Sequence, residues 1–410
     1  MQANINRNQL FLASRIALVL TGMTFAFRAS LEGVWGAQFS LTKEQIGWIF
    51  SPAFWGFTLA MIVGGPLCDV LGMKRLLILA FIGHLAGVII YLVAGDATML
   101  FIGTVCIGIG NGMVEAACNP LVVSLYPGNK TTMLNKFHVW FPGGIVIGGL
   151  IAYLLLDQLK LDWHIMIAIL FIPAAIYGFL FFKLSFPQTE RVTKGVSTKQ
   201  MFSSCLNPLF LIMLACMFLT AATELGTNQW LPGFLQSAGV SGILVLVLIN
   251  GVMALGRAFA GPVVHRINPN GMLIFSALFA GIGLLLLSNV SGNAAFAAAL
   301  VFAVGICFFW PTMLGFVSEY LPNTGALGLS LMGGGGMLSV AFILPVMGRW
   351  FENFKKAAIA TGATAAEADN IASSSTFMKV ALMPAILLVV FIIIYFARRK
   401  HYVKPTRQIA

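Results

Sequence analysis

The sequence predicts an all-α membrane protein with twelve transmembrane helices in two six-helix, pseudo-symmetric halves. Its composition is 59% hydrophobic and only 9% charged, whereas soluble domains carry about 25% charged residues. A span needs about 20 apolar residues, so the 410 residues accommodate up to about a dozen spans joined by short loops. A Gly-Pro motif that recurs about half a chain later indicates the two halves.

The apolar segments give the expected order of the spans. They lie at residues 12–38, 44–69, 75–95, 98–125, 133–156, 163–186, 207–236, 241–265, 271–290, 294–320, 325–350 and 376–398. The polar segment 187–206 is the predicted cytoplasmic linker between an N-terminal bundle, 1–186, and a C-terminal bundle, 207–398, and residues 399–410 form a cytoplasmic tail. Segment 351–375 is expected to be a second polar loop.

The basic residues predict the orientation of the chain. They gather where even-numbered spans end, at Lys74, Arg75, Lys130 and the tail that begins at Arg398. The positive-inside rule then places both termini in the cytoplasm of a plasma membrane, the inner membrane in a bacterium. The net charge of +11 is therefore a property of span ends and predicts no nucleic-acid partner.

The reactive side chains do not form a recognisable chemical motif. The six cysteines lie in or beside apolar runs without CxxC or His/Cys spacing, so no metal site and no disulfide framework is predicted. The sequence contains no nucleophile–base pair and no ATP-binding motif. We therefore expect a protein that is not an enzyme and needs no cofactor.

One helix carries a carboxylate at membrane depth. Asn111, Glu115 and Asn119 are four residues apart, so they share one stripe of span 98–125. A carboxylate there costs several kcal/mol unless it faces water or a partner, which makes it a functional candidate. The alternative is a buried acid that only holds helices together.

The two halves share a motif at a constant offset. Gly65-Pro66 and Asp69 leave the second span, and Gly261-Pro262 and His265 leave the eighth, 196 residues later. The same offset places Arg28 opposite Glu224. A repeat of six spans in one orientation is a plan found in many secondary transporters.

The first copy of this motif resembles the signature between spans 2 and 3 of the major facilitator superfamily. The glycines, the acid and the basic pair stand at the family spacing, and the second copy is looser because His265 replaces the acid. The resemblance implies the twelve-helix fold of that superfamily and a gating role for the residues of both copies. These are Gly65, Asp69, Gly72, Lys74, Arg75, Arg257 and Gly261.

Within that superfamily the chain resembles the fucose–glucose/galactose–proton symporter group. Four stretches carry the resemblance: 112–120, 134–143, 222–232, and 309–312 followed by the glycines 333–336. It implies import of a monosaccharide, a neutral hexose such as glucose, galactose, mannose or fucose, together with a proton. The chain departs from the fucose branch in its first span, where Arg28 and Glu32 stand in place of a single acid.

Glu115 is the predicted proton carrier, with Arg28 and Glu32 as coupling partners. Burial disfavours a charged carboxylate, while a nearby cation favours it. Protonation of Glu115 would then release Arg28, if the first and fourth spans meet. The alternative is a permanent salt bridge from Arg28 to Glu32 or Glu115 that braces the bundle.

Amides and aromatic rings are the predicted substrate contacts. Amides donate and accept hydrogen bonds, as sugar hydroxyls require, and an indole covers the C–H face of a sugar. The alternative is a network of hydrogen bonds between helices. The candidates are Asn111, Asn119, Asn135, His138, Glu224, Asn228, Gln229, Trp230, Asn250 and Trp310.

Rival functions remain open on the sequence. Arg28 would suit an anionic sugar acid, and the same architecture serves proton-driven exporters of sugars or drugs. A sugar sensor without transport is a further rival. Sodium could replace the proton, because a carboxylate with Asn oxygens can coordinate it. We expect a monomer in the lipid bilayer.

Overall fold

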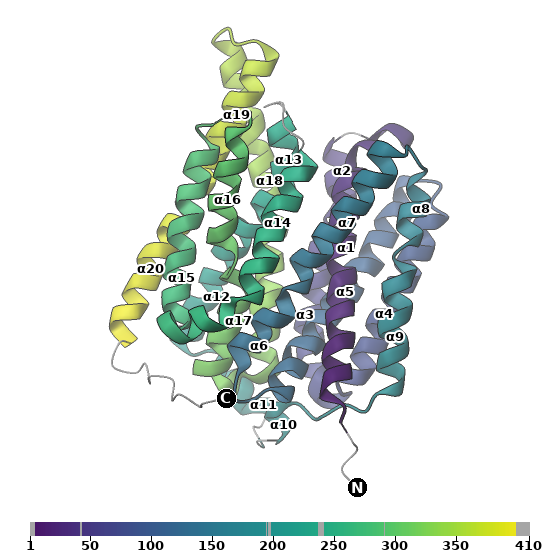
Figure 1. The fold of residues 1–410 in the computed structure, drawn as a ribbon, viewed down its shortest axis with the longest axis vertical. Helices are drawn as coiled ribbons and strands as arrows, with labels where there is room; N and C mark the ends of the chain where they lie inside the picture. Colours follow the sequence, from purple (N-terminus) through teal and green to yellow (C-terminus); the bar gives the residue numbers. More distant parts are fainter. Residues whose placement is uncertain are drawn as a thin grey trace.

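Twelve apolar helical segments cross the described part of the molecule, as the sequence predicts. The computed structural model describes residues 5–41, 43–193, 195, 198–236, 242–290 and 292–398, and these residues hold helices and no strand. Eleven helical segments are long and apolar enough to cross a membrane, and the shorter apolar helix Ile243–Ala258 completes the set. Figure 1 shows them as two groups standing side by side, with α1 beginning and α20 ending at the same end of the bundle.

The first half contains six spans, of which three are interrupted. Their elements are α1 (Arg7–Gln38), α2 (Lys43–Phe50) with α3 (Pro52–Val70), α4 (Met73–Leu92), α5 (Ala97–Leu125), α6 (Lys130–His138) with α7 (Trp140–Ala152) and the π-helix η1 (Tyr153–Gln158), and α8 (Trp163–Ala168) with α9 (Phe171–Lys183). The connecting segment carries the short helices α10 (Glu190–Thr193) and α11 (Thr198–Cys205). The side chains of Arg191 and Lys194 lie outside the described residues.

The second half repeats this plan with different interruptions. Its elements are α12 (Pro208–Ala221), the π-helix η2 (Ala222–Gly226) and α13 (Thr227–Gln236), then α14 (Gly242–Ala258), α15 (Ala260–Leu287), α16 (Ala294–Ile306) with α17 (Phe309–Tyr320), η3 (Pro322–Thr324), α18 (Gly325–Ala360), α19 (Ala365–Val380) and α20 (Leu382–Arg398). The tail 399–410 lies outside the described residues.

The prediction that 351–375 forms a polar loop is wrong. Helix α18 has 36 residues, roughly 54 Å at the α-helical rise, so it outruns a hydrocarbon core of about 30 Å. After a short turn, α19 begins at a capping box between Thr364 and Glu367, and Lys355 pairs with Asp369 at 2.7 Å across the two helices. Alanine-rich polar sequence favours helix strongly, and Figure 1 shows this hairpin projecting beyond the other helices.

The halves approach one another through small residues. A Cβ on Gly65 of α3 would lie 2.6 Å from the Ser330 hydroxyl of α18, and one on Gly315 of α17 would lie 2.5 Å from the Thr131 hydroxyl of α6. Thr131 also donates a hydrogen bond to Glu319. Towards the other end of the bundle, a Cβ on Gly149 of α7 would meet Val247 of α14 at 2.9 Å. The interface is therefore packed near both of its ends.

Candidate functional site

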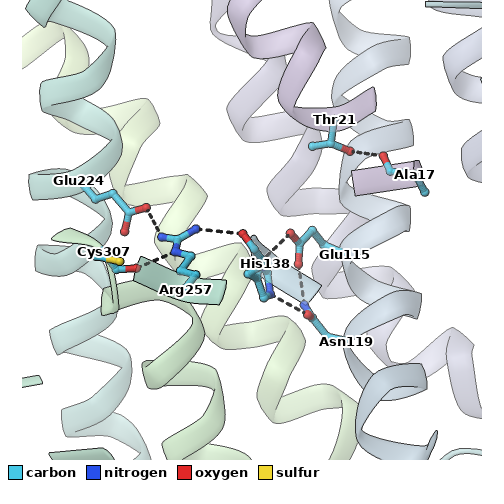
Figure 2. Close-up of polar contacts among 8 residues, drawn as sticks. All are labelled: Ala17, Thr21, Glu115, Asn119, His138, Glu224, Arg257 and Cys307. Atoms are coloured by element: carbon cyan, nitrogen blue, oxygen red, sulfur yellow. Dashed lines mark hydrogen bonds and ion pairs between the residues drawn. The ribbon is translucent and has the colours of Figure 1, made fainter. Parts of the chain in front are cut away.

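Five buried polar side chains meet between the two halves. Glu115 and Asn119 come from α5, His138 from the end of α6, Arg257 from α14 and Glu224 from η2, and each is at most 3% exposed. Figure 2 shows Arg257 between Glu224 on one side and the His138–Glu115–Asn119 group on the other. We call these five residues the central cluster.

Helix interruptions explain why the central cluster can form. His138 is the last residue of α6, Cys307 lies between α16 and α17, and Glu224 sits in a π-helical turn. The residues four positions after His138 and Cys307 are Pro142 and Pro311. Proline has no N–H, so the carbonyls of His138 and Cys307 lose their usual helical donors and remain available to other groups.

Arg257 uses both of these carbonyls. Its Nε donates to the Cys307 carbonyl at 2.6 Å and its Nη1 to the His138 carbonyl at 3.3 Å. Its Nη2 donates to Glu224 Oε1 at 2.9 Å, which makes a buried ion pair. The guanidinium thus links the two halves and has both a counter-charge and oxygen acceptors, as a buried cation requires.

The hydrogen bonds around Glu115 fix the protonation of His138. The Asn119 amide Nδ2 donates to Glu115 Oε2 at 2.6 Å, so its Oδ1 faces His138 Nε2 at 3.1 Å as an acceptor. His138 must therefore donate from Nε2. In a neutral imidazole the other nitrogen, Nδ1, then carries a lone pair, and it faces Glu115 Oε1 at 3.8 Å.

This arrangement has room for one shared proton. A bare Nδ1 and a carboxylate oxygen repel one another, whereas one proton on either atom turns the contact into an attraction. The separation of 3.8 Å is too long for a hydrogen bond and must shorten when the proton arrives. Glu115 and His138 can therefore share one added proton while the hydrogen bonds of Asn119 to both of them remain.

Several buried oxygens around the central cluster have no hydrogen-bond donor. Each lies on a helix of the cluster or beside it, within about two turns of a cluster residue or of Cys307. They are Asn135 Oδ1, Glu224 Oε2, Asn228 Oδ1, Asn250 Oδ1 and Thr312 Oγ1. A buried acceptor without a donor costs free energy, so these atoms are suited to a ligand rich in hydroxyl donors.

Other predicted contact residues are engaged elsewhere. Asn111 points into the first half, where its Oδ1 lies 2.9 Å from His84 Nε2 and its Nδ2 donates to the Thr24 hydroxyl at 3.0 Å. The Trp230 indole donates to the Leu344 carbonyl at 3.2 Å, and Gln229 is half-buried. Trp310 is buried, and a Cβ on Gly336 would lie 2.8 Å from its ring. The glycines 333–336 therefore provide close packing within an unbroken α18.

Arg28 and Glu32 lie apart from Glu115. No ion pair joins Arg28 to either acid within the described part of the chain. The Arg28 guanidinium instead lies 4.7 Å, 5.7 Å and 5.3 Å from the ring centres of Phe25, Phe50 and Phe54, whereas Glu32 is exposed. The cation beside the Glu115–His138 contact is Arg257.

The gating candidates of the first copy lie at the end of the bundle where α1 begins. Lys74 donates to the carbonyls of Phe182 and Leu184 at 2.8 and 3.0 Å, tying α4 to the end of α9. Asp69 accepts a hydrogen bond from Thr189 of the connecting segment. Gly72 has a φ of 83° that favours glycine, and Arg75 is exposed.

The second copy behaves differently. Arg257, expected among the gating residues, belongs to the central cluster. The side-chain placement of His265 lies outside the described residues, and so do the surroundings of Gly261. Sequence reasoning also missed the carbonyl of Cys307 as a ligand of Arg257, although Pro311 four residues later is the signal that could have found it. Within the described residues, no group of His, Cys, Asp and Glu is placed to hold a metal ion.

The curated relatives are membrane transporters at low identity. The gallate transporter of Pseudomonas putida is 24% identical over 78% of this chain and 82% of its own length. The D-galactonate transporter of Escherichia coli is 28% identical over 40% of this chain and 37% of its length. An uncharacterised transporter of Buchnera aphidicola is 22% identical over 63% and 64%. The match therefore spans less than two thirds of several of these relatives.

Solved structures share the fold over almost the whole chain. The proton:xylose symporter XylE superposes with a TM-score of 0.76 at 15% identity, covering 93% of this chain and 94% of that one. The fucose:proton symporter FucP of E. coli gives 0.68 at 17% identity, covering 93% and 98%. The family model described as Major Facilitator Superfamily matches residues 14–344. The chain therefore belongs to the Major Facilitator Superfamily, a family of membrane transporters and not of enzymes.

Proposed function

We propose that the protein imports a neutral monosaccharide together with a proton by alternating access. The observation that carries the coupling is the Glu115–His138 contact, which suits a single shared proton. The free acceptor oxygens around the central cluster support a ligand rich in hydroxyl groups. Sites of this kind form where interrupted helices of the two halves meet near the bilayer midplane.

The mechanism follows from what the proton does to the contact between the halves. His138 belongs to the first half, and its carbonyl accepts from Arg257 of the second. When the proton draws Glu115 and His138 together, α6 shifts relative to Arg257, and the bound sugar adds its own hydrogen bonds. Proton and sugar can drive the change only through their different affinities for the two states. Release of both on the inner side resets the transporter.

The proposal also includes the orientation of the chain in the membrane. Both termini, the connecting segment 187–206 and the contacts of Asp69 and Lys74 lie on the cytoplasmic side. The basic residues at the even-numbered span ends support this. The α18–α19 hairpin then projects outside the cell. The N-terminal bundle, 1–186, and the C-terminal bundle, 207–398, move against each other in a monomer.

A second candidate function is symport of an anionic sugar acid. The observation that favours it is Arg28, a buried cation without a counter-charge in the described residues, and the D-galactonate transporter is among the relatives. In this case the substrate carboxylate would approach Arg28. The neutral-sugar proposal has more support because most of the unpaired atoms around the central cluster are amide or carboxylate oxygens, which only accept hydrogen bonds and repel a carboxylate.

The test is uptake by proteoliposomes containing wild-type protein or Glu115→Gln. The panel contains labelled glucose, galactose, mannose, fucose, N-acetylglucosamine and a sugar acid, each with and without an inward proton gradient or a sodium gradient. Glu352→Gln, an exposed glutamate on α18, is the matched control. We expect gradient-driven accumulation of a neutral sugar in wild type and control. In Glu115→Gln accumulation should be lost while sugar exchange persists.

The other outcomes each overturn a part of the proposal. Accumulation of the acid alone selects the second candidate. Outward transport against the sugar gradient makes the protein an exporter, and dependence on sodium instead of protons removes the proton role. Binding without flux would make it a sensor. If flux were indifferent to Glu115→Gln, the proposed coupling mechanism would fail.

A further inference from the structure

A small internal cavity lies inside the first half, apart from the central cluster. Its volume is about 10 Å³, enough for one water-sized sphere, and Thr24, Arg28, Trp35 and Tyr91 are among the residues that line it. All lining residues come from the first half, so the cavity does not lie between the two halves. Arg28 is 3% exposed and Trp35 is fully buried.

The cavity is lined by residues whose N–H donors have no acceptor. Arg28 Nε, Arg28 Nη2 and Trp35 Nε1 are buried and make no hydrogen bond. The neighbouring hydroxyls do not accept from these N–H groups: Thr24 donates to the Thr21 carbonyl and accepts from Asn111, and Tyr91 bonds to Thr104. A buried donor without an acceptor is unfavourable, and more so when it is charged. The cavity therefore requires an acceptor.

The charge of Arg28 also requires compensation. The rings of Phe25, Phe50 and Phe54 surround the guanidinium and attract it through their faces. Rings do not replace the oxygen acceptors that a guanidinium seeks, and no carboxylate pairs with Arg28 in the described residues. A buried cation without a partner is strongly unfavourable. The occupant should therefore bring a negative charge.

A water molecule and a substrate carboxylate both fit the cavity poorly. Water would accept from the donors but would leave the charge of Arg28 unpaired. A sugar acid would have to bring its carboxylate, with the sugar attached, into a small space lined only by residues of the first half. A monatomic anion meets the hydrogen-bonding and charge requirements, since it accepts from several N–H groups and neutralises the guanidinium.

We propose that the Arg28–Trp35 cavity binds one small inorganic anion of halide size, chloride under ordinary conditions. The bound anion completes the packing of the first half and locks α1 against its neighbours. This inference does not depend on the proposed transport function, because it concerns the interior of one half. Its test is made on the purified protein without any transported substrate.

The first measurement is thermal unfolding in detergent at constant ionic strength while chloride or bromide replaces methanesulfonate, an anion too large for the cavity. We expect the Tm of the wild type to rise saturably, by roughly 3–5 °C at high occupancy. Arg28→Met should abolish the rise, and Trp35→Phe, which keeps a ring but removes the N–H, should weaken the anion affinity. Arg7→Met, an exposed arginine on the same helix, is the control that should behave as wild type.

The second measurement locates the anion directly. Crystals grown with bromide should show an anomalous scattering peak beside Arg28, so the inference stays testable even if Arg28→Met does not fold. An equal Tm rise in wild type and Arg28→Met would mean a general salt effect and would overturn the proposal. So would a Tm independent of halide, which indicates water. Protection by a sugar acid but not by halide would make Arg28 a substrate clamp instead.

Discussion

The two buried arginines of this protein are held in opposite ways. Arg257 has a carboxylate and two backbone carbonyls as partners, so its guanidinium is well satisfied. Arg28 lies among three aromatic rings and keeps two buried nitrogens without an acceptor. The difference arises from the backbone, because Pro142 and Pro311 free the carbonyls that Arg257 uses. Within the described residues, no carbonyl accepts a hydrogen bond from Nε or Nη2 of Arg28.

The surroundings of the two arginines also suit different ligands. Around Arg257 the unpaired buried atoms are oxygens, which call for donors such as sugar hydroxyls. Around Arg28 the unpaired atoms are N–H donors, which call for an anion. Arg28 and Glu224 are 196 residues apart, the same offset that relates the two copies of the motif. Residues at one offset in the sequence thus differ in charge and in partners.

The largest expected effect is the difference in stability between Arg257→Met and Arg28→Met. Arg257→Met leaves Glu224 as an uncompensated buried charge, which should cost about 3–5 kcal/mol of stability. Arg28→Met breaks no ion pair and removes an uncompensated buried charge, so in chloride-free buffer it should not lower the stability. Unfolding in detergent would measure both. Adding Glu224→Gln to Arg257→Met should recover much of the loss, and equal losses at the two arginines would contradict the comparison.

A smaller effect is expected where the two halves touch. Gly315→Ala crowds Thr131 near the end where α1 begins, and Gly149→Ala crowds Val247 towards the other end. Overpacking typically costs about 1–3 kcal/mol. On the proposed orientation, the first change favours the inward-open state and the second the outward-open state. Spin-label distances across each end should shift in opposite directions, and shifts in the same direction would disprove this assignment.

The prolines allow a finer test of how Arg257 is held. Pro142→Ala or Pro311→Ala restores an N–H that competes with Arg257 for the carbonyl of His138 or Cys307. Each change should weaken the hydrogen bond from Arg257 to that carbonyl by about 1 kcal/mol. A double-mutant cycle with Arg257→Met would measure the coupling. Pro52→Ala, at the first turn of α3, is a control for which the cycle should show no coupling.

The smallest expected effect concerns the wall of the Arg28 cavity. Asp162 caps α8 by accepting from the His164 N–H at 2.8 Å, and Trp163 beside it packs on Trp35. The hydrogen bonds from His164 lower the pKa of Asp162 below its ordinary value. A lowered folded-state pKa means that the cap stabilises α8 above the unfolded-state pKa and is lost as the pH falls through the folded value.

Asp162→Asn keeps a capping oxygen but removes the charge, so it should flatten this acid dependence. Hydrogen exchange of the α8 amides between pH 3 and 5 would detect the difference, with the pH range taken about the ordinary pKa of aspartate. Chloride affinity at the Arg28 cavity should change less than twofold. A large loss of affinity would mean that the wall of the cavity depends on this cap more than the packing indicates.

Much of the architecture followed from the sequence because it rests on local patterns. Runs of about 20 apolar residues fix the spans, and the motif from Gly65 to Arg75 resembles a signature of the superfamily to which the chain belongs. The stripe on α5 singled out Glu115 and Asn119, which do lie together with a hydrogen bond of 2.6 Å. The prediction that Asn111 faces the same way was wrong. Residues four apart differ by about 40° around the helix axis, and Asn111 faces His84 inside the first half.

The sequence by itself determined the membrane class, the spans and the presence of buried charges, since each depends on composition or on neighbours along the chain. Only the tertiary structure decided which charges meet. Glu224 and Arg257 are 33 residues apart and pair at 2.9 Å, whereas Arg28 and Glu32, one turn apart, do not pair. Charge pairing in a membrane depends on which helix faces adjoin and which carbonyls the backbone leaves free, and both are properties of the packed bundle.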